Sequence, residues 1–171
     1  SLQTRFGLKE SKFWHILVRI QRAIIIFCSL ASVFMICAAV LMRYIFKIDF
    51  YGIEEIIVIV AFWLYFMGAS HGSYEKSHIK ADIVYNYVKN GRIKNIVSLT
   101  SSLIATFTTV IMTKWAFDYF IWGIEKGARS PGWKIPLVTS QSAIFFGLLL
   151  MAFYAVVYLA DDIKKVVRDR D

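Results

Sequence analysis

Few side chains in this sequence are of types that carry chemistry, and their spacing matches no catalytic or cofactor site. The histidines are His15, His71 and His78, whereas a di-haem four-helix protein needs paired histidines inside the bundle as axial ligands. Cys28 and Cys37 are nine residues apart, which puts them on opposite faces of one helix, so they cannot bridge each other. No metal-ligand cluster, phosphate loop or nucleophile elbow occurs in the sequence. We therefore expect neither an enzyme nor a bound cofactor or metal.

Three charged residues that flank a short loop are the best candidates for an ion site. Arg43 follows the first apolar stretch, and Glu54 and Glu55 open the second. They can form a buried ion-pair network, or the acids can complement the positive N-terminal end of a helix and pair at the surface. We favour the second interpretation, because a proton-coupling acid is expected deeper in a span, and we identify no acid at mid-membrane.

Four long apolar stretches must position these side chains. The chain has 171 residues, of which 58% are apolar, against roughly 45–50% in soluble domains. The stretches without Asp, Glu, Lys or Arg are 23–42, 56–74, 95–113 and 137–160. Each matches the ~20 helical residues that cross a hydrocarbon core about 30 Å thick. We predict an all-α membrane protein in a single domain, residues 1–171, with transmembrane helices at 23–46, 54–74, 95–122 and 137–160.

The segment before the first span has its own periodicity. Phe13, Ile16, Leu17 and Ile20 recur at i, i+3, i+4 and i+7, and the basic residues fall largely on other faces. This pattern predicts an amphipathic helix at residues 8–22 that lies in the membrane interface. The alternative is a plain extension of the first span. A similar apolar set predicts a second interfacial helix around residues 83–88.

The positive charges flank the spans. The net charge is +8, but the basic residues do not line one helix or loop beside aromatic platforms, so we exclude nucleic acid as a partner and expect the lipid bilayer instead. Lys and Arg number 14 in the N-terminal segment, the loop after span two and the C-terminal tail, against 6 on the other side. This excess predicts that both termini lie in the cytoplasm.

The third span and the loop after it differ from the rest. Span three carries eight hydroxyl side chains between Asn95 and Thr113, and such a helix is suited to contact with protein. Span two contains the GxxxG spacing Gly68–Gly72, which by itself is a weak packing signal. Pro131 and Pro136 interrupt any helix between spans three and four.

The order of four short motifs resembles a known family. RYIF is followed by IEE at the start of span two, then by SHIKADIV, then by ARSPGWKIP before span four. Over about 120 residues this succession is similar to the small membrane subunit of tripartite ATP-independent periplasmic (TRAP) transporters. Two positions depart from the pattern, Gly52 in place of a tryptophan and Ser77 in place of a glutamate. The resemblance places the family's characteristic residues at Arg43, Glu54, Glu55, His78, Asp82, Pro131 and Pro136.

The resemblance implies a division of labour. A periplasmic binding protein captures an organic acid anion, such as sialic acid or a C4-dicarboxylate, and a large multi-span subunit carries it with sodium across the bacterial inner membrane. The small subunit is a scaffold without a transport site of its own. We expect the loops near Arg43 and around Pro131 to face the binding protein, and a charge reversal at Arg129 or Lys134 tests the second loop.

Two other interpretations stay open at this point. The chain can be an independent small ion-coupled transporter that works as a homodimer, for which the distinguishing feature is an acid embedded in the membrane. It can also be a redox subunit, which the absorbance spectrum of haem would reveal.

Overall fold

The computed structural model describes residues 12–48, 52–75 and 91–168, and most of these residues are helical. The helices are α1 (Lys12–Tyr44), α2 (Ile53–Glu75), α4 (Gly91–Lys126) and α5 (Val138–Arg168). All four are long and apolar enough to cross a membrane. The predicted fold class, an all-α membrane protein with four transmembrane helices, is therefore confirmed.

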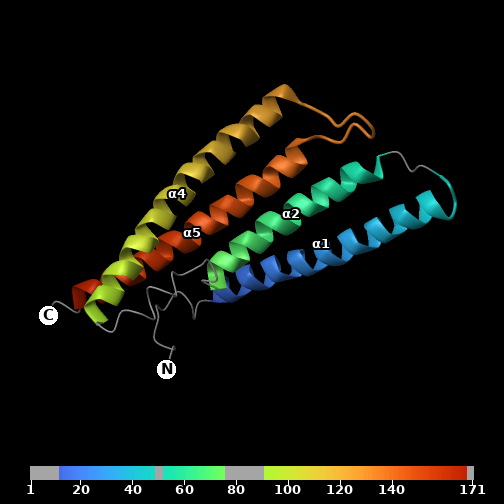
Figure 1. Ribbon diagram of the computed structural model, residues 1–171. Helices are drawn as coiled ribbons and strands as arrows, with labels where there is room; N and C mark the ends of the chain where they lie inside the picture. Colours follow the sequence, from blue (N-terminus) through green and yellow to red (C-terminus); the bar gives the residue numbers. More distant parts are fainter. Residues whose placement is uncertain (1–11, 49–51, 76–90, 169–171) are drawn as a thin grey trace.

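The four helices lie side by side in one layer, in the order α1, α2, α5, α4 (Figure 1). Contacts join α1 to α2, α2 to α5, and α5 to α4. The layer consists of two antiparallel hairpins whose inner helices, α2 and α5, run parallel to each other. We call the end where α1 begins and α5 ends the terminal end, and the end with residues 45–48, Gly52 and residues 127–137 the hairpin end. Within residues 12–48, 52–75 and 91–168, the layer is one helix thick and no described helix covers either of its faces.

Local sequence signals account for three of the eight ends of the four helices. Glu54 and Glu55 occupy the first turn of α2, where carboxylates complement the helix dipole. Lys126 ends α4, and Gly127 follows with φ +57°, the left-handed conformation that commonly terminates helices. Pro136 precedes α5. The helix α5 continues past Ala160 to Arg168.

The beginning of α1 is not a separate element. One continuous helix runs from Lys12 through the expected boundary at residues 22 and 23, as the alternative of a plain extension requires. Ile16 and Ile20 of the predicted apolar stripe are 54% exposed, whereas Leu17 packs against the core. The placement of residues 8–22 in the membrane interface stays a prediction. The second interfacial helix, expected around residues 83–88, lies outside the described residues.

Two kinds of contact hold the layer together. At the terminal end a core of Trp14, Val18, Tyr154 and Tyr158 joins α1 to α5, with Tyr74 of α2 packed against it. Near the middle, α2 crosses α5 at Gly147, where a Cβ would lie 2.9 Å from the carbonyl oxygen of Phe66. The GxxxG spacing of α2 serves no such crossing at Gly68, because a Cβ there would meet open space. Of the two free cysteines, Cys28 is buried and Cys37 is exposed.

Candidate functional site

The carboxylate of Glu55 binds the loop that joins α4 to α5. Its Oε2 accepts hydrogen bonds from the hydroxyl of Ser130 (2.6 Å) and from the backbone N–H of Trp133 (2.9 Å). Its Oε1 accepts a hydrogen bond from the backbone N–H of Gly132 (2.7 Å). Hydrogen bonds to an ionised acceptor are short and strong, so this one side chain ties the loop to α2. We call Glu55 and residues 128–137 the loop clasp.

The loop is folded tightly enough to wrap around one carboxylate. Arg129 and Pro136 form an isolated antiparallel bridge, and the Ser130 N–H donates to the carbonyl of Ile135 (2.9 Å). The Ile135 N–H donates in turn to the Ser130 hydroxyl (3.0 Å). Gly132 lets the carboxylate approach closely, because a Cβ would lie 2.8 Å from Glu55 Oε1 and would displace it. The loop clasp is thus an ordered structure at the hairpin end.

The clasp also brings the two loops of the hairpin end together. The indole of Trp133 lies against Gly52, in the space that a Cβ would need. Gly52 has φ +93°, a backbone conformation that residues with a Cβ rarely adopt. Trp133 itself is 48% exposed and offers an aromatic surface at this end.

Arg43 and Glu54 meet at the surface rather than in a buried network. Arg43 Nη2 lies 3.9 Å from Glu54 Oε1, and the two side chains are 60% and 80% exposed. Exposed ion pairs of this kind add little stability. Glu55, the neighbouring acid, takes its hydrogen bonds from the loop. The two adjacent acids therefore have different surroundings, which their sequence alone does not indicate.

The other predicted residues of this end surround the clasp. Arg129, Pro131 and Pro136 are exposed. A hollow of about 280 Å³ opens between the loop and the start of α2, and its lining includes Glu54, Val58, Ile59, Pro131 and Pro136. His78 and Asp82, the remaining predicted residues, lie outside the described residues.

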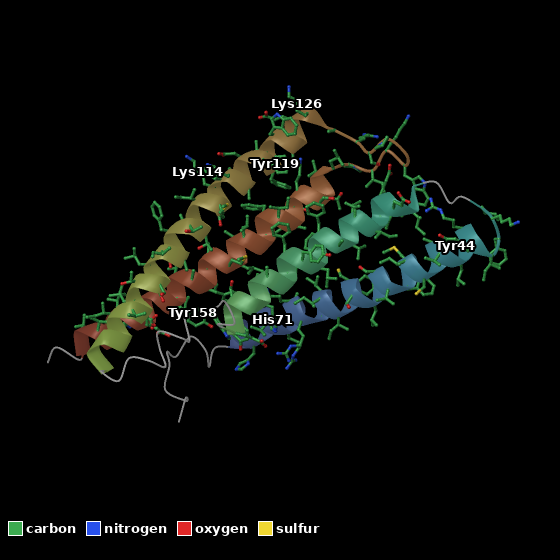
Figure 2. The ribbon with its side chains drawn as sticks, in the orientation of Figure 1. Tyr44, His71, Lys114, Tyr119, Lys126 and Tyr158 are labelled. Atoms are coloured by element: carbon green, nitrogen blue, oxygen red, sulfur yellow. The ribbon has the colours of Figure 1, made fainter. Side chains whose placement is uncertain are left out.

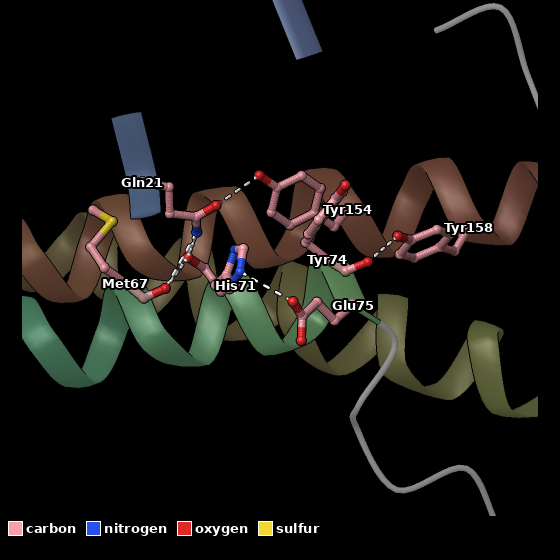
Figure 3. Close-up of polar contacts among 8 residues, drawn as sticks. Gln21, Met67, His71, Tyr74, Glu75, Tyr154 and Tyr158 are labelled. Carbon is pink, nitrogen blue, oxygen red and sulfur yellow. Dashed lines mark hydrogen bonds and ion pairs between the residues drawn. The ribbon is translucent and has the colours of Figure 1, made fainter. Parts of the chain in front are cut away.

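A buried polar network at the terminal end was not predicted (Figure 3). Gln21 of α1 is 2% exposed; its Nε2 donates to Ser70 Oγ and to the carbonyl of Met67 (3.3 Å). Its Oε1 accepts a hydrogen bond from the hydroxyl of Tyr154 in α5 (3.0 Å). One amide therefore joins three helices. The only sequence signal was a glutamine next to an apolar stretch, which periodicity does not distinguish from an exposed polar residue.

The hydroxyl side chains of α4 are used mainly within this chain. Thr100, Thr106, Thr109 and Thr113 donate to backbone carbonyls of their own helix. Thr113 also donates to the carbonyl of Leu148 in α5 (3.1 Å). At the terminal end, Ser98 and Ser102 donate to Oδ2 of the buried Asp162 (3.0 and 2.6 Å). These hydroxyls join α4 to α5, so they do not by themselves mark a face for another protein.

Within residues 12–48, 52–75 and 91–168, no group of three or more His, Cys, Asp and Glu side chains is placed to hold a metal ion. The polar contacts of the layer instead join helices to one another or to a loop. Glu55 makes them at the hairpin end and Gln21 at the terminal end.

Comparison with known families gives one match. The model of the family described as "Tripartite ATP-independent periplasmic transporters, DctQ component" matches residues 17–165, which cover the first span from residue 17 onward and the other three spans completely. No similar protein of curated function and no similar solved structure was found.

Proposed function

Because the chain belongs to the DctQ component family of tripartite ATP-independent periplasmic transporters, we propose that it is the scaffold subunit to which the large membrane subunit binds. Family membership makes the chain a transporter component with four helices able to span the membrane. The scaffold role, the cargo and the orientation in the membrane are our proposals.

The observation that supports a scaffold is the open, one-layer arrangement of the helices. A carrier encloses its substrate between packed elements near mid-membrane. Here α1 and α4 lie at opposite edges of the layer, and large apolar side chains such as Phe27, Phe34 and Phe107 are 67–76% exposed. Such a layer offers wide apolar surfaces to lipid and to a second membrane protein.

The proposed cargo and orientation follow from the family and from the charges. The complete transporter imports an organic acid anion, such as sialic acid or a C4-dicarboxylate, together with sodium, after a periplasmic binding protein delivers it. Both termini lie in the cytoplasm of a bacterial inner membrane, because 14 of the 20 Lys and Arg residues flank that side. The loop clasp then faces the periplasm, where Arg129 and Lys134 can contact the binding protein.

Reconstitution tests this function. Liposomes are prepared with the chain alone, with the large subunit alone, and with both, and uptake of a labelled carboxylate is measured with and without a sodium gradient and the binding protein. We expect uptake only when the chain, the large subunit and the binding protein are all present. Uptake by the chain alone would refute the scaffold role.

One observation favours the alternative of an independent homodimeric carrier. Asp118 lies on α4 beside Phe117, whose ring contacts Phe145 within the apolar stretch of α5 (5.5 Å between centroids). This neighbourhood supports the alternative, because an acid within the membrane is the feature that an independent carrier needs. An independent carrier would show proton-driven flux in liposomes that contain only this chain, and Asp118→Asn would abolish that flux.

A further inference from the structure

The contacts between helices fix which residues lie near the middle of the layer. Gly147 packs against Phe66, and each is within two residues of the centre of its own apolar stretch, 137–160 in α5 and 56–74 in α2. The centres of the apolar stretches of α2 and α5 therefore lie at the same level, which is the expected level of the bilayer centre. The hydrogen bond from Thr113 to the carbonyl of Leu148 places this part of α4 at the same level, near the centre of the apolar stretch of α5.

Lys114 of α4 lies close to that centre. It follows Thr113 directly, and Leu148 is the twelfth of the 24 residues in the apolar stretch of α5. The charge-free run of α4 stops at Thr113, and the predicted span 95–122 does not by itself fix the depth of Lys114. The pairing of α4 with α5 places Lys114 about half the thickness of the ~30 Å hydrocarbon core from either surface.

Asp118 lies one helical turn further along, still within the apolar depth. The rings of Phe117 and Phe120, on either side of it in sequence, both contact Phe145 (5.5 and 5.8 Å). Phe145 is eight residues, or about 12 Å, inside the start of the apolar stretch at Leu137. An acid and a base therefore sit near each other at a depth where charges are costly.

Neither side chain is covered by the described part of the chain. Lys114 and Asp118 are exposed, and neither forms an ion pair with a described residue. Figure 2 shows Lys114 on the outer edge of α4, directed away from α5. They lie on one face of the helix, which we call the outer α4 face, together with the exposed residues Leu103, Phe107, Val110 and Ile121.

Exposing this face to lipid would be energetically unfavourable, because it carries two charged residues. A four-carbon lysine stem cannot cover the roughly 15 Å from mid-membrane to the surface, and an aspartate has a shorter side chain. Charged residues within membranes almost always face protein or a water-filled cavity and pair with other groups. The apolar residues on both sides of Lys114 along the same face match the side of another transmembrane helix.

We propose that the outer α4 face is the surface on which the large membrane subunit binds, and that this partner presents a carboxylate to Lys114 and a hydrogen-bond donor or cation to Asp118. The inference rests on the proposed function and adds the location and chemistry of the contact. A second copy of this chain is the competing occupant, because Lys114 of one copy could meet Asp118 of another.

The test uses a photo-crosslinking amino acid introduced at position 114 of the full chain in its native membranes. The matched control carries the same amino acid at Phe34, which is 76% exposed on α1 at the opposite edge. After illumination, the cross-linked products are purified through a tag on the chain and identified by mass spectrometry. We expect position 114 to give a product with a large multi-span membrane protein and position 34 to give little of it.

Charge variants provide the second readout. Lys114→Glu should lower the amount of co-purified large subunit at least about tenfold, because it places like charges together away from water. Lys126→Glu, the same change at the last residue of α4, should leave that amount unchanged.

The other outcomes are distinct. A large subunit that co-purifies but cross-links only at position 34, or that tolerates Lys114→Glu, would overturn the inference and leave the proposed function intact. A product of two copies of this chain at position 114 would also overturn it. Failure of the unmodified chain to retain any large membrane protein would reject the proposed function as well.

Discussion

Single side chains decide how the ends of this layer are held. Glu54 and Glu55 are adjacent in sequence, yet one forms an exposed pair with Arg43 and the other holds a ten-residue loop through three hydrogen bonds. The difference comes from position on the helix, because successive residues point about 100° apart and only one of them can face the loop.

The two acids should therefore respond differently to the same substitution. Glu55→Gln removes the charge that strengthens three hydrogen bonds. A carboxamide also has only one acceptor oxygen, and its NH₂ group would face at least one donor of the loop. We expect faster proteolysis within residues 128–137 and a lower midpoint of thermal unfolding in detergent. Glu54→Gln is the matched control and should change neither. Equal effects of the two substitutions would contradict the loop clasp.

At the terminal end, the buried hydrogen bonds of Gln21 can be tested by substitution in the same way. Gln21→Leu leaves the Tyr154 hydroxyl and Ser70 without their shared partner, so we expect a loss of roughly 1–3 kcal/mol in the free energy of unfolding. Adding Tyr154→Phe should cost less than the sum of the two single changes, because the two residues share one hydrogen bond. Thr100→Ala, which alters an exposed hydroxyl bonded to its own helix, should have little effect. Additive losses for Gln21 and Tyr154 would argue against the network.

At the scale of helices, the close crossing of α2 and α5 depends on one glycine. Gly147→Leu forces its side chain into the backbone of Phe66 and should destabilise the chain by about 1–3 kcal/mol or more. Gly68→Leu makes the same change at an open position of α2 and should be tolerated by the isolated chain. Thermal unfolding of both variants in detergent distinguishes the two sites, and a larger loss at Gly68 would show that the helices are packed differently.

The helices were predictable, but their lateral order was not. Four charge-free stretches of sufficient length were enough to predict four spans. Inside lipid, however, all faces of a helix are apolar, so periodicity does not indicate which face contacts a neighbour. The order α1, α2, α5, α4, the hydrogen bond between Glu55 and Ser130 75 residues away, and the contact of Phe117 with Phe145 all depend on that missing information.

At the scale of the whole molecule, the layer must have a defined orientation. Lys134 lies at the hairpin end, which the distribution of charges assigns to the periplasm. In a variant with Cys28 and Cys37 replaced by serine, Lys134→Cys should react in intact cells with a maleimide that cannot cross the inner membrane. A cysteine introduced at Lys164, near the other end, should react only after the membrane is opened. The reverse pattern would invert the topology.

Because the described helices form one layer with two open apolar faces, we expect the protein to be found with a partner. The most direct test is to tag the chain, extract native membranes in mild detergent and determine the identity and stoichiometry of what stays bound. We expect one large multi-span membrane protein per copy of the chain. Recovery of the chain only as a homo-oligomer would contradict it and would make Asp118 the first residue to examine in an independent carrier.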